Sequence, residues 1–338
     1  MRTLRTIVMT ALISGLSVGA VATSGATGEA VERRGYVAGK YGLELSSANV
    51  GWVFEAGGGG PVADVTVQQK AEGQYPKKHV AAVKYQDITL AVGAGMQPAF
   101  YDWIKATLRS PGGAARKDGA VVVADYRSRE TSRTTFTRAV VSDVEFPALD
   151  VASKDAVAKI NVTISPQATR RVVSSAQGLV GAPVDKSMQR KWAPSSFRLS
   201  IDGIDPSATA SVVKVDAISA RTRTVGATGG DLRDYEKTPS GVDVSNLAIE
   251  LPEAHAEPFY RWLDDFLARG NNADDKEKSG KLELLAQDLK GVVFTLSFGH
   301  LGIIKVVPVS APEGDANRRV RVEMYVESLG FDFVPSQL

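Results

Sequence analysis

Few side chains in this 338-residue sequence have the types and the spacing that chemistry requires. The three histidines, His79, His255 and His300, lie far apart, and none belongs to a helical His-x-x-x-His pair of the kind that binds zinc. The sequence contains no cysteine, which excludes disulfides, thiolate catalysis and thiolate metal ligands. A Ser-His-Asp triad stays open, because the members of a triad come from distant parts of a chain. The residues therefore predict neither a metal site nor a bound cofactor.

Two carboxylate pairs could serve acid–base chemistry, namely Asp143 with Glu145 and Asp264 with Asp265. The first pair alternates along a predicted strand, and the second lies beside the exposed face of a predicted helix, so we interpret both as solvated. Asn161-Val-Thr163 fits the glycosylation pattern, but it lies within a predicted strand. None of these patterns predicts an enzyme.

The strongest pattern is an aromatic segment that occurs twice, at residues 99–108 and 258–267. Trp103 and Trp262 stand in the same frame (262 − 103 = 159), although the chain has only four tryptophans. The apolar positions have the spacing of one helical face. The tryptophans could stack on a sugar, but their place in the apolar stripe favours core packing. We expect two amphipathic helices whose core residues are Phe100, Trp103, Ile104, Leu108, Phe259, Trp262, Leu263 and Leu267.

The segments around these helices recur as well. Residues 85–90 before the first helix match 244–251 before the second, and the β-rich runs 120–124 and 281–285 follow them. Next come Thr135-Phe-Thr137 and Val293-Phe-Thr295, and then the strands 158–164 and 320–326. The sequence therefore predicts a tandem duplication of one mainly β (α+β) domain that has a single flanking helix.

The N-terminus has the form of an export signal at residues 1–22. Arg2 and Arg5 precede an apolar run, and Ala20 and Ala22 provide a small-x-small cleavage site. The alternative is an N-terminal helix of a cytoplasmic protein. The formal net charge of +2 is nearly balanced, so composition indicates neither nucleic-acid nor membrane binding for the mature protein.

The organisation that follows is a leader at 23–36, a first domain at 37–171, a linker at 172–194 and a second domain at 195–335. The four glycines 57–60 predict a loop rather than a dinucleotide-binding turn, since no helix start follows them. Residues 70–84, with several lysines, Gly73 and Pro76, suit an extended surface loop, and 271–280 a charged loop tip.

The first domain resembles the tail-tube proteins of contractile phages, which are related to the tubes of extracellular injection systems and to the haemolysin-coregulated protein of type VI secretion. The matching order is the opening strand 41–45, the segment 53–55, then Lys84-Tyr-Gln-Asp-Ile-Thr-Leu90, and the Phe-Tyr-x-Trp-Ile helix at 100–104. The resemblance covers about residues 37–170 closely and 195–335 more loosely. It implies two tandem β-sandwich or barrel-like domains that associate into rings.

On this resemblance we expect a non-enzymatic structural protein without cofactors, similar to tail-tube or hub components. Its partners would be other copies of itself, as a homotrimer with pseudo-six-fold symmetry, and other tail or injection-system components. The alternative is an exported binding or envelope module that reuses the tube fold. The protein would be periplasmic or extracellular if the signal is real, and otherwise part of a virion or a cytoplasmic tail-like particle.

Overall fold

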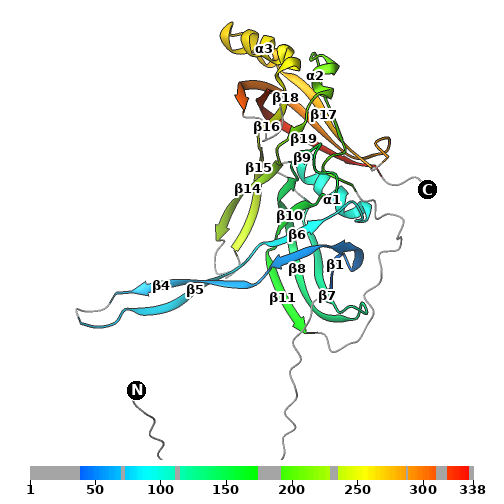
Figure 1. Ribbon diagram of the computed structural model, residues 1–338. Helices are drawn as coiled ribbons and strands as arrows, with labels where there is room; N and C mark the ends of the chain where they lie inside the picture. The colour runs from blue at the N-terminus through cyan, green and yellow to red at the C-terminus, as the bar shows by residue number, and fades with distance from the viewer. Residues whose placement is uncertain are drawn as a thin grey trace, which may run out of the picture. The chain divides into compact units, whose positions relative to one another are not determined.

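A computed structural model describes residues 39–69, 73–110, 115–173, 192–228, 235–286, 288–309 and 318–334. The fold is mainly β, and residues Val37–Leu338 form one compact unit (Figure 1). The strands fall into a ten-stranded sheet, a seven-stranded sheet and an isolated two-stranded hairpin. We call the elements from β1 to β11 repeat 1, and those from β12 to β19 repeat 2.

The elements of repeat 1 are β1 (Lys40–Leu45), β2 (Ala48–Val53), β3 (Glu55–Gly58), β4 (Pro61–Gln68), β5 (Lys77–Tyr85), β6 (Ile88–Val92), α1 (Pro98–Arg109), β7 (Lys117–Ala124), β8 (Glu130–Phe146), β9 (Leu149–Asp150), β10 (Ile160–Ser165) and β11 (Ala168–Val173).

The elements of repeat 2 are β12 (Phe197–Ile201), α2 (Pro206–Ala210), β13 (Lys214–Val215), β14 (Ile218–Thr228), β15 (Tyr235–Val244), β16 (Leu247–Pro252), the 3₁₀ turn η2 (Glu253–His255), α3 (Glu257–Leu263), the π-helical turn η3 (Asp264–Ala268), the 3₁₀ turn η4 (Asp274–Lys276), β17 (Lys278–Leu285), β18 (Val292–Val309) and β19 (Arg319–Phe333).

The two large sheets have the same strand order at their centres. Repeat 1 contains β1-β7-β8-β10-β6, and repeat 2 contains β12-β17-β18-β19-β16. In both, the helix follows the last-named of these strands along the chain, α1 after β6 and α3 after β16. The long strand β19 takes the place of β10 and β11 together. A duplication of one domain would produce this correspondence, which stays our interpretation of the repeat.

The ladder register equates individual residues of the two repeats. Gly119 of β7 pairs with Phe136 of β8, and Gly280 of β17 pairs with Phe298 of β18, with a β-bulge beside each glycine. Both phenylalanines are buried. The structure thus equates Phe136 with Phe298, whereas the sequence comparison aligned it with Phe294, four residues earlier. Bulges keep the correspondence while they shift the residue numbers.

Each repeat also has a hairpin before its helix, β4–β5 in repeat 1 and β14–β15 in repeat 2, and each hairpin has a bulge at the same place. An ion pair beside that bulge joins Asp64 to Lys84 at 2.7 Å in the first hairpin and Arg223 to Asp243 at 3.1 Å in the second. The two hairpins are therefore equivalent in register but carry reversed charges.

Helix α1 has the apolar stripe that its sequence predicts. Pro98 opens the helix, where its missing N–H costs nothing, and Phe100, Trp103, Ile104 and Leu108 are buried in the core. The indole Nε1 of Trp103 donates a hydrogen bond to the carbonyl of Ala115 at 2.6 Å. This bond ties Ala115, which lies just before β7, to the buried side of the helix.

The second helix differs from its prediction. Phe259 and Trp262 are buried and Leu263 is half-buried, but Leu267 is 47% exposed and Phe266 is buried instead. Regular α-helix ends at Leu263, and the next five residues form a π-helical turn. A π turn adds one residue per turn and so rotates the apolar face. The assignment of Leu267 to the helix core was therefore wrong.

Three segments predicted as loops contain strand residues. Gly57 and Gly58 belong to β3, and a Cβ at Gly58 would lie 2.0 Å from the carbonyl oxygen of Asp87, so close approach to the neighbouring chain requires glycine. The predicted surface loop at 70–84 contains β5, which starts at Lys77. Likewise, β17 begins at Lys278 inside the predicted loop tip 271–280.

Candidate assembly surfaces

The structure does not gather the candidate catalytic residues into one site. His79 lies on β5, His255 ends a 3₁₀ turn and His300 lies within β18. Asp143 forms an ion pair with Arg221 of β14 at 3.1 Å, so its role is a contact between strands. The residues that could do chemistry are therefore spread over separate elements.

The other candidate carboxylates also have structural partners. Glu145 accepts a hydrogen bond from the Nδ2 of Asn161 at 3.1 Å, which places the glycosylation pattern on β10. Asp264 forms an ion pair with Arg269 at 2.9 Å, and Asp265 accepts a hydrogen bond from Asn271 at 2.9 Å. These are local contacts of exposed or half-buried groups.

One acidic cluster joins Glu277, His300 and Glu327 closely enough to hold a cation. The two oxygens of Glu277 already have partners, since His300 Nδ1 lies 2.7 Å from Oε2 and the Tyr325 hydroxyl donates to Oε1 at 2.5 Å. Burial, and then the hydrogen bond to the Glu277 carboxylate, raise the pKa of Tyr325. The cluster is explained as a hydrogen-bonded support of β18 and β19.

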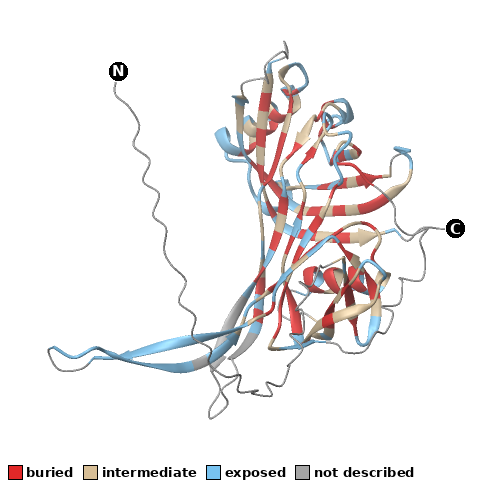
Figure 2. Cartoon of the chain, turned by 60° about the horizontal axis from the view of Figure 1, so that its bottom comes forward, coloured by how far each residue is buried: buried red, intermediate tan, exposed pale blue. Residues whose placement is uncertain are grey.

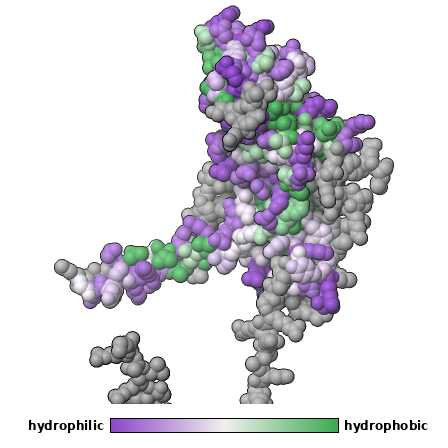
Figure 3. Space-filling model, in the orientation of Figure 1, coloured by the Kyte–Doolittle hydropathy of each residue, from purple (hydrophilic) through white to green (hydrophobic). Residues whose placement is uncertain are grey.

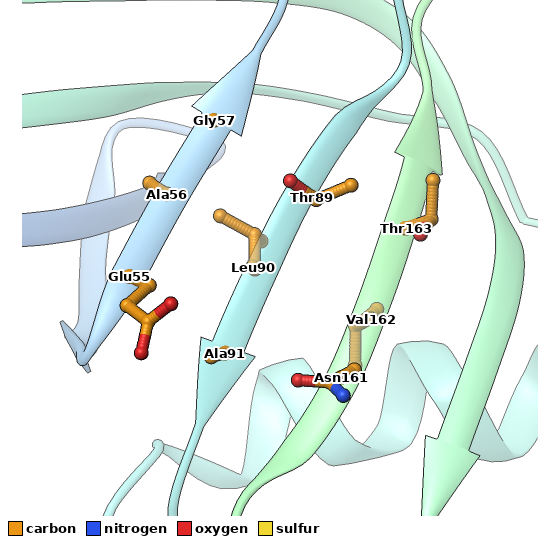
Figure 4. Close-up of a pocket in the computed structure, with 9 residues that line it drawn as sticks. All are labelled: Glu55, Ala56, Gly57, Thr89, Leu90, Ala91, Asn161, Val162 and Thr163. Carbon is orange, nitrogen blue, oxygen red and sulfur yellow. The ribbon is translucent and has the colours of Figure 1, made fainter.

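A shallow hollow lies on the sheet face formed by β3, β6 and β10, and Figure 4 shows its lining. Glu55 at its rim is paired with Lys159 at 2.7 Å, which lowers the pKa of Glu55. The remaining lining comprises small or amide side chains such as Thr89, Ala91 and Asn161. This face offers hydrogen-bonding groups but no nucleophile beside a base.

The equivalent face of repeat 2, on β13, β16 and β19, carries an ion-pair network instead. Arg321 contacts Asp216 at 2.5 Å and Glu323 at 2.9 Å, and Lys214 contacts Glu250 at 3.3 Å. The hydrogen bond from Arg321 lowers the pKa of Glu323. The two repeats thus share a backbone but differ in the chemistry of their surfaces.

The most extensive feature is the contact between the repeats, and its first part is a shared strand ladder. Strand β14 of repeat 2 pairs antiparallel with the end of β8 in repeat 1. The Oγ1 of Thr222 donates to the carbonyl of Val141 at 3.0 Å. Ile218 and Ala220 of β14 are each 2% exposed. The ladder pairs Ile218 with Phe146, Ser219 with Glu145, Ala220 with Val144 and Arg221 with Asp143.

The second part of the contact is aromatic. Tyr101 of α1 packs against three rings at the end of the repeat 2 sheet, with centroid distances of 5.4 Å to Phe294, 6.1 Å to Phe331 and 4.3 Å to Phe333. Its hydroxyl donates to the carbonyl of Gly93 at 2.7 Å. Burial raises the pKa of this tyrosine. Helix α1 therefore covers the apolar end of β18 and β19.

Two further contacts complete this surface. Lys105 of α1 forms an ion pair with Asp332 of β19, and β9 of repeat 1 pairs with β13 of repeat 2. Repeat 1 therefore donates β9 to the seven-stranded sheet, and repeat 2 donates the hairpin β14–β15 to the ten-stranded sheet. The contact is heterologous, because repeat 1 and repeat 2 use different surfaces.

Comparison with known protein families gives a match for repeat 1. Residues 53–169 match the family model described as "T4-like virus tail tube protein gp19". Repeat 1 is tail-tube-like. The match spans β3 to β11 and includes the predicted Phe-Tyr-x-Trp-Ile helix. The resemblance to the contractile phage tail-tube family, drawn above from 37–170, is thereby confirmed for repeat 1.

Solved structures with similarity to the chain have related descriptions. They include a protein of an extracellular contractile injection system, the PVC sheath-tube complex in its extended state, with 16% identity, 45% of this chain and 100% of that chain covered, and a TM-score of 0.37. The anti-feeding prophage baseplate gives 14% identity, 41% and 91% coverage, and a TM-score of 0.31. Hcp1 from Flavobacterium johnsoniae gives 10% identity, 42% and 98% coverage, and a TM-score of 0.25. All three TM-scores lie below 0.5. No curated protein matches the chain.

The remaining predictions about the termini are untested. The predicted signal at 1–22, with Ala20 and Ala22, and the leader at 23–36 lie outside the described residues, as does most of the predicted linker 172–194. Among the described helices, none combines the length and apolarity that crossing a bilayer requires.

Proposed function

We propose that this protein is a non-enzymatic structural component resembling tail-tube or hub proteins, and that three copies form a ring of six tube-like repeats. The tail-tube match of repeat 1 supports the structural role. The observation that carries the ring is the heterologous contact between the repeats, in which β14 pairs with β8. Contacts of this head-to-tail kind close into rings when the rotation permits.

The sheet topology supports three copies rather than six. Repeat 1 and repeat 2 have the same central strand order, so one chain supplies two similar positions of a ring. Six positions then need three chains. Other tail or injection-system components are the expected partners of such a ring, in a virion, a tail-like particle or an exported assembly.

Negative-stain electron microscopy of the purified protein, together with its native mass, tests this proposal. We expect rings of six similar lobes around a central hole and a mass three times the 35.9 kDa of one chain. Separate two-lobed particles with the mass of one chain would overturn the ring. An exported binding or envelope module that reuses the tube fold would then be the better interpretation.

A further inference from the structure

The contact between the repeats joins two different surfaces. Within one chain, each repeat contributes one of these surfaces and leaves its equivalent of the other surface without a partner repeat. Repeat 1 contributes α1 and the edge of β8, while repeat 2 contributes the hairpin β14–β15 and the aromatic end of β18 and β19. We propose that a second copy of this chain occupies the two unused sides. Hairpin β4–β5 of one copy covers the β18 edge of the next copy, and α3 of that next copy fills a hollow in repeat 1. This inference rests on the proposed ring and names its interface.

Hairpin β4–β5 exposes an apolar face. Val65, Val67 and Val80 are 55%, 49% and 66% exposed, and Val65 pairs directly with Val80. The hairpin projects from the rest of the described fold, and Figures 2 and 3 show it as exposed and partly apolar. At the base of the counterpart hairpin, Ile218 and Ala220, which take the positions of Gly59 and Pro61, are buried against β8. An exposed apolar strand pair of this kind marks an interaction surface.

The receiving edge is the end of β18. Across residues 305–309, β19 is the one strand that pairs with β18 in the described part of the chain. The bulges of β8 and β18 equate Val144 with Val306 and Phe146 with Pro308. Val144 and Phe146 are buried under β14, whereas Val306 is half-buried and Pro308 is exposed. The same edge is thus covered in repeat 1 and uncovered in repeat 2.

The register of the β14–β8 ladder within the chain predicts the register of the proposed ladder between β4 of one copy and β18 of the next. Pro61 and Pro308 have no N–H, so the ladder between copies contains fewer hydrogen bonds than the internal ladder. Burial of Val62, which is 43% exposed in the single chain, then contributes more of the binding free energy. The register transferred from β14 and β8 pairs Gly59 with Pro308, Gly60 with Val307, Pro61 with Val306 and Val62 with Lys305.

The second unused surface is a hollow of about 610 Å³ in repeat 1, which is lined by residues of β1, β3, β4, β6, β7, β8 and β11. Ser132 and Arg171 contribute to the lining. The strand registers equate them with Phe294 and Phe331 of repeat 2. Those two phenylalanines pack against Tyr101 of α1. The hollow therefore occupies the place that a helix fills in repeat 2.

Helix α3 has complementary features for this hollow. Tyr260 stands at the position of Tyr101 and is half-buried. Lys105 of α1 pairs with the acidic end of β19, and Asp264 takes its position in the second repeat. The corresponding strand β11 presents Arg171, which is exposed. By the same registers Val172 takes the place of Asp332, and the adjacent Arg171, which lines the hollow, offers a positive charge to Asp264.

The partner is a second copy because both unused surfaces lie on opposite repeats of the same chain. Repeat 1 offers the hairpin and the hollow, and repeat 2 offers the β18 edge and α3. Within one chain, the hairpin and hollow of repeat 1 cannot bind the β18 edge and α3 of repeat 2, because the internal contact already holds the two repeats in a different arrangement. The competing occupant is the chain's own leader, residues 23–36, which the experiments below distinguish from a second copy.

Engineered disulfides test the ladder, because the natural sequence has no cysteine. Residues paired across antiparallel strands are about 4.5–5.5 Å apart at Cα, within the range of about 4.4–6.8 Å that a disulfide spans. We would oxidise the full-length Val62→Cys/Lys305→Cys variant. The matched control is Asp143→Cys/Arg221→Cys, which should form the equivalent bond within one chain. An off-register control combines Thr66→Cys with Lys305→Cys.

We expect the Val62→Cys/Lys305→Cys variant to migrate as covalent dimers and trimers on a non-reducing gel, with no larger species, while both controls stay monomeric. Because three chains close the ring, the series of cross-linked species on the gel should end at the trimer. If wild-type rings form but this variant yields only monomers, the proposed interface is wrong and the ring stands. If wild-type protein is monomeric, the ring itself fails.

Charge reversal tests the hollow independently. Asp264→Arg and Arg171→Asp should each weaken ring assembly at least tenfold, and the double variant should restore it. Arg269, the present partner of Asp264, is 71% exposed, so its pair contributes little. Arg261→Asp on the exposed face of α3 serves as the control and should leave assembly unchanged. If neither Asp264→Arg nor Arg171→Asp weakens assembly, the proposed contact of α3 with the hollow is wrong, and the leader becomes the favoured occupant.

Discussion

Tyr101 of helix α1 stacks on Phe333, the last residue of strand β19, with ring centroids 4.3 Å apart and an interplanar angle of 25°. The two residues belong to different repeats and are far apart in the sequence (333 − 101 = 232). Their contact therefore couples the stability of the first helix to that of the last strand, and it defines the side of the molecule on which the repeats meet.

The first prediction concerns the hydroxyl of Tyr101. It donates to the Gly93 carbonyl at 2.7 Å and accepts from the Met96 N–H at 3.2 Å. Tyr101→Phe leaves both groups buried without that partner, so we expect a loss of about 1–3 kcal/mol in the free energy of unfolding. Urea denaturation measures this loss. The control Tyr260→Phe, at a half-buried position, should lose less than about 1 kcal/mol; equal losses would contradict the assignment.

The second prediction concerns the ladder between the repeats. Thr222→Val keeps the shape of the side chain but removes the hydroxyl that donates to the Val141 carbonyl. We expect a destabilisation of about 1–2 kcal/mol by chemical denaturation. Thr66→Val, whose hydroxyl donates at 3.3 Å on the exposed hairpin, should change stability by less than about 0.5 kcal/mol. A larger effect at Thr66 than at Thr222 would show that β14 does not stabilise repeat 1.

Sequence reasoning placed both aromatic helices because their spacing is distinctive. Trp103 and Trp262 stand in the same frame, and both lie in the core. The fold class followed from the β-rich segments around them. Leu267 was misplaced because a π-helical turn rotates the last residues of the helix, and no sequence pattern used here indicates such a turn.

The sequence could not predict the contacts between the repeats, for a different reason. Strand β9 consists of Leu149 and Asp150 alone, and it pairs with Lys214 and Val215 of the other repeat. A two-residue strand has no periodicity to recognise. The hairpin strand β5 was read as a loop because Gly73, Pro76 and its lysines suit a turn, and because its valines are exposed rather than part of an alternating core.

The third prediction is a dependence of stability on acid. The hydrogen bond from Arg321, helped by Lys305, lowers the pKa of Glu323 below its ordinary value of 4.5. A lowered pKa in the folded state stabilises the protein above the unfolded value and loses that contribution as pH falls through the folded value. We expect the stability advantage of wild type over Glu323→Gln to be full at pH 7 and to shrink below about pH 4.5.

Thermal denaturation of both proteins from pH 7 to pH 3 measures this difference. Glu257→Gln removes an exposed i,i+4 pair with Arg261 and is the control, because such pairs contribute little at any pH. A constant gap between wild type and Glu323→Gln over the whole range would mean that the variant acts through packing rather than through the carboxylate charge.

The fourth prediction uses the equivalence of two glycines. A Cβ at Gly119 would lie 2.1 Å from the Glu44 carbonyl oxygen and 2.5 Å from the Phe136 ring, whereas at Gly280 the nearest atom, the Ser200 carbonyl oxygen, is 2.9 Å away. Alanine normally stabilises a strand position by about 0.5–1 kcal/mol relative to glycine. At Gly119 the backbone of β1 would have to move, so we expect Gly119→Ala to cost about 2–3 kcal/mol or more. Gly280→Ala needs a smaller shift and should cost less than about 1 kcal/mol. Urea denaturation of the two variants compares them directly, and a reversed order would show that the bulges of β7 and β17 are not equivalent.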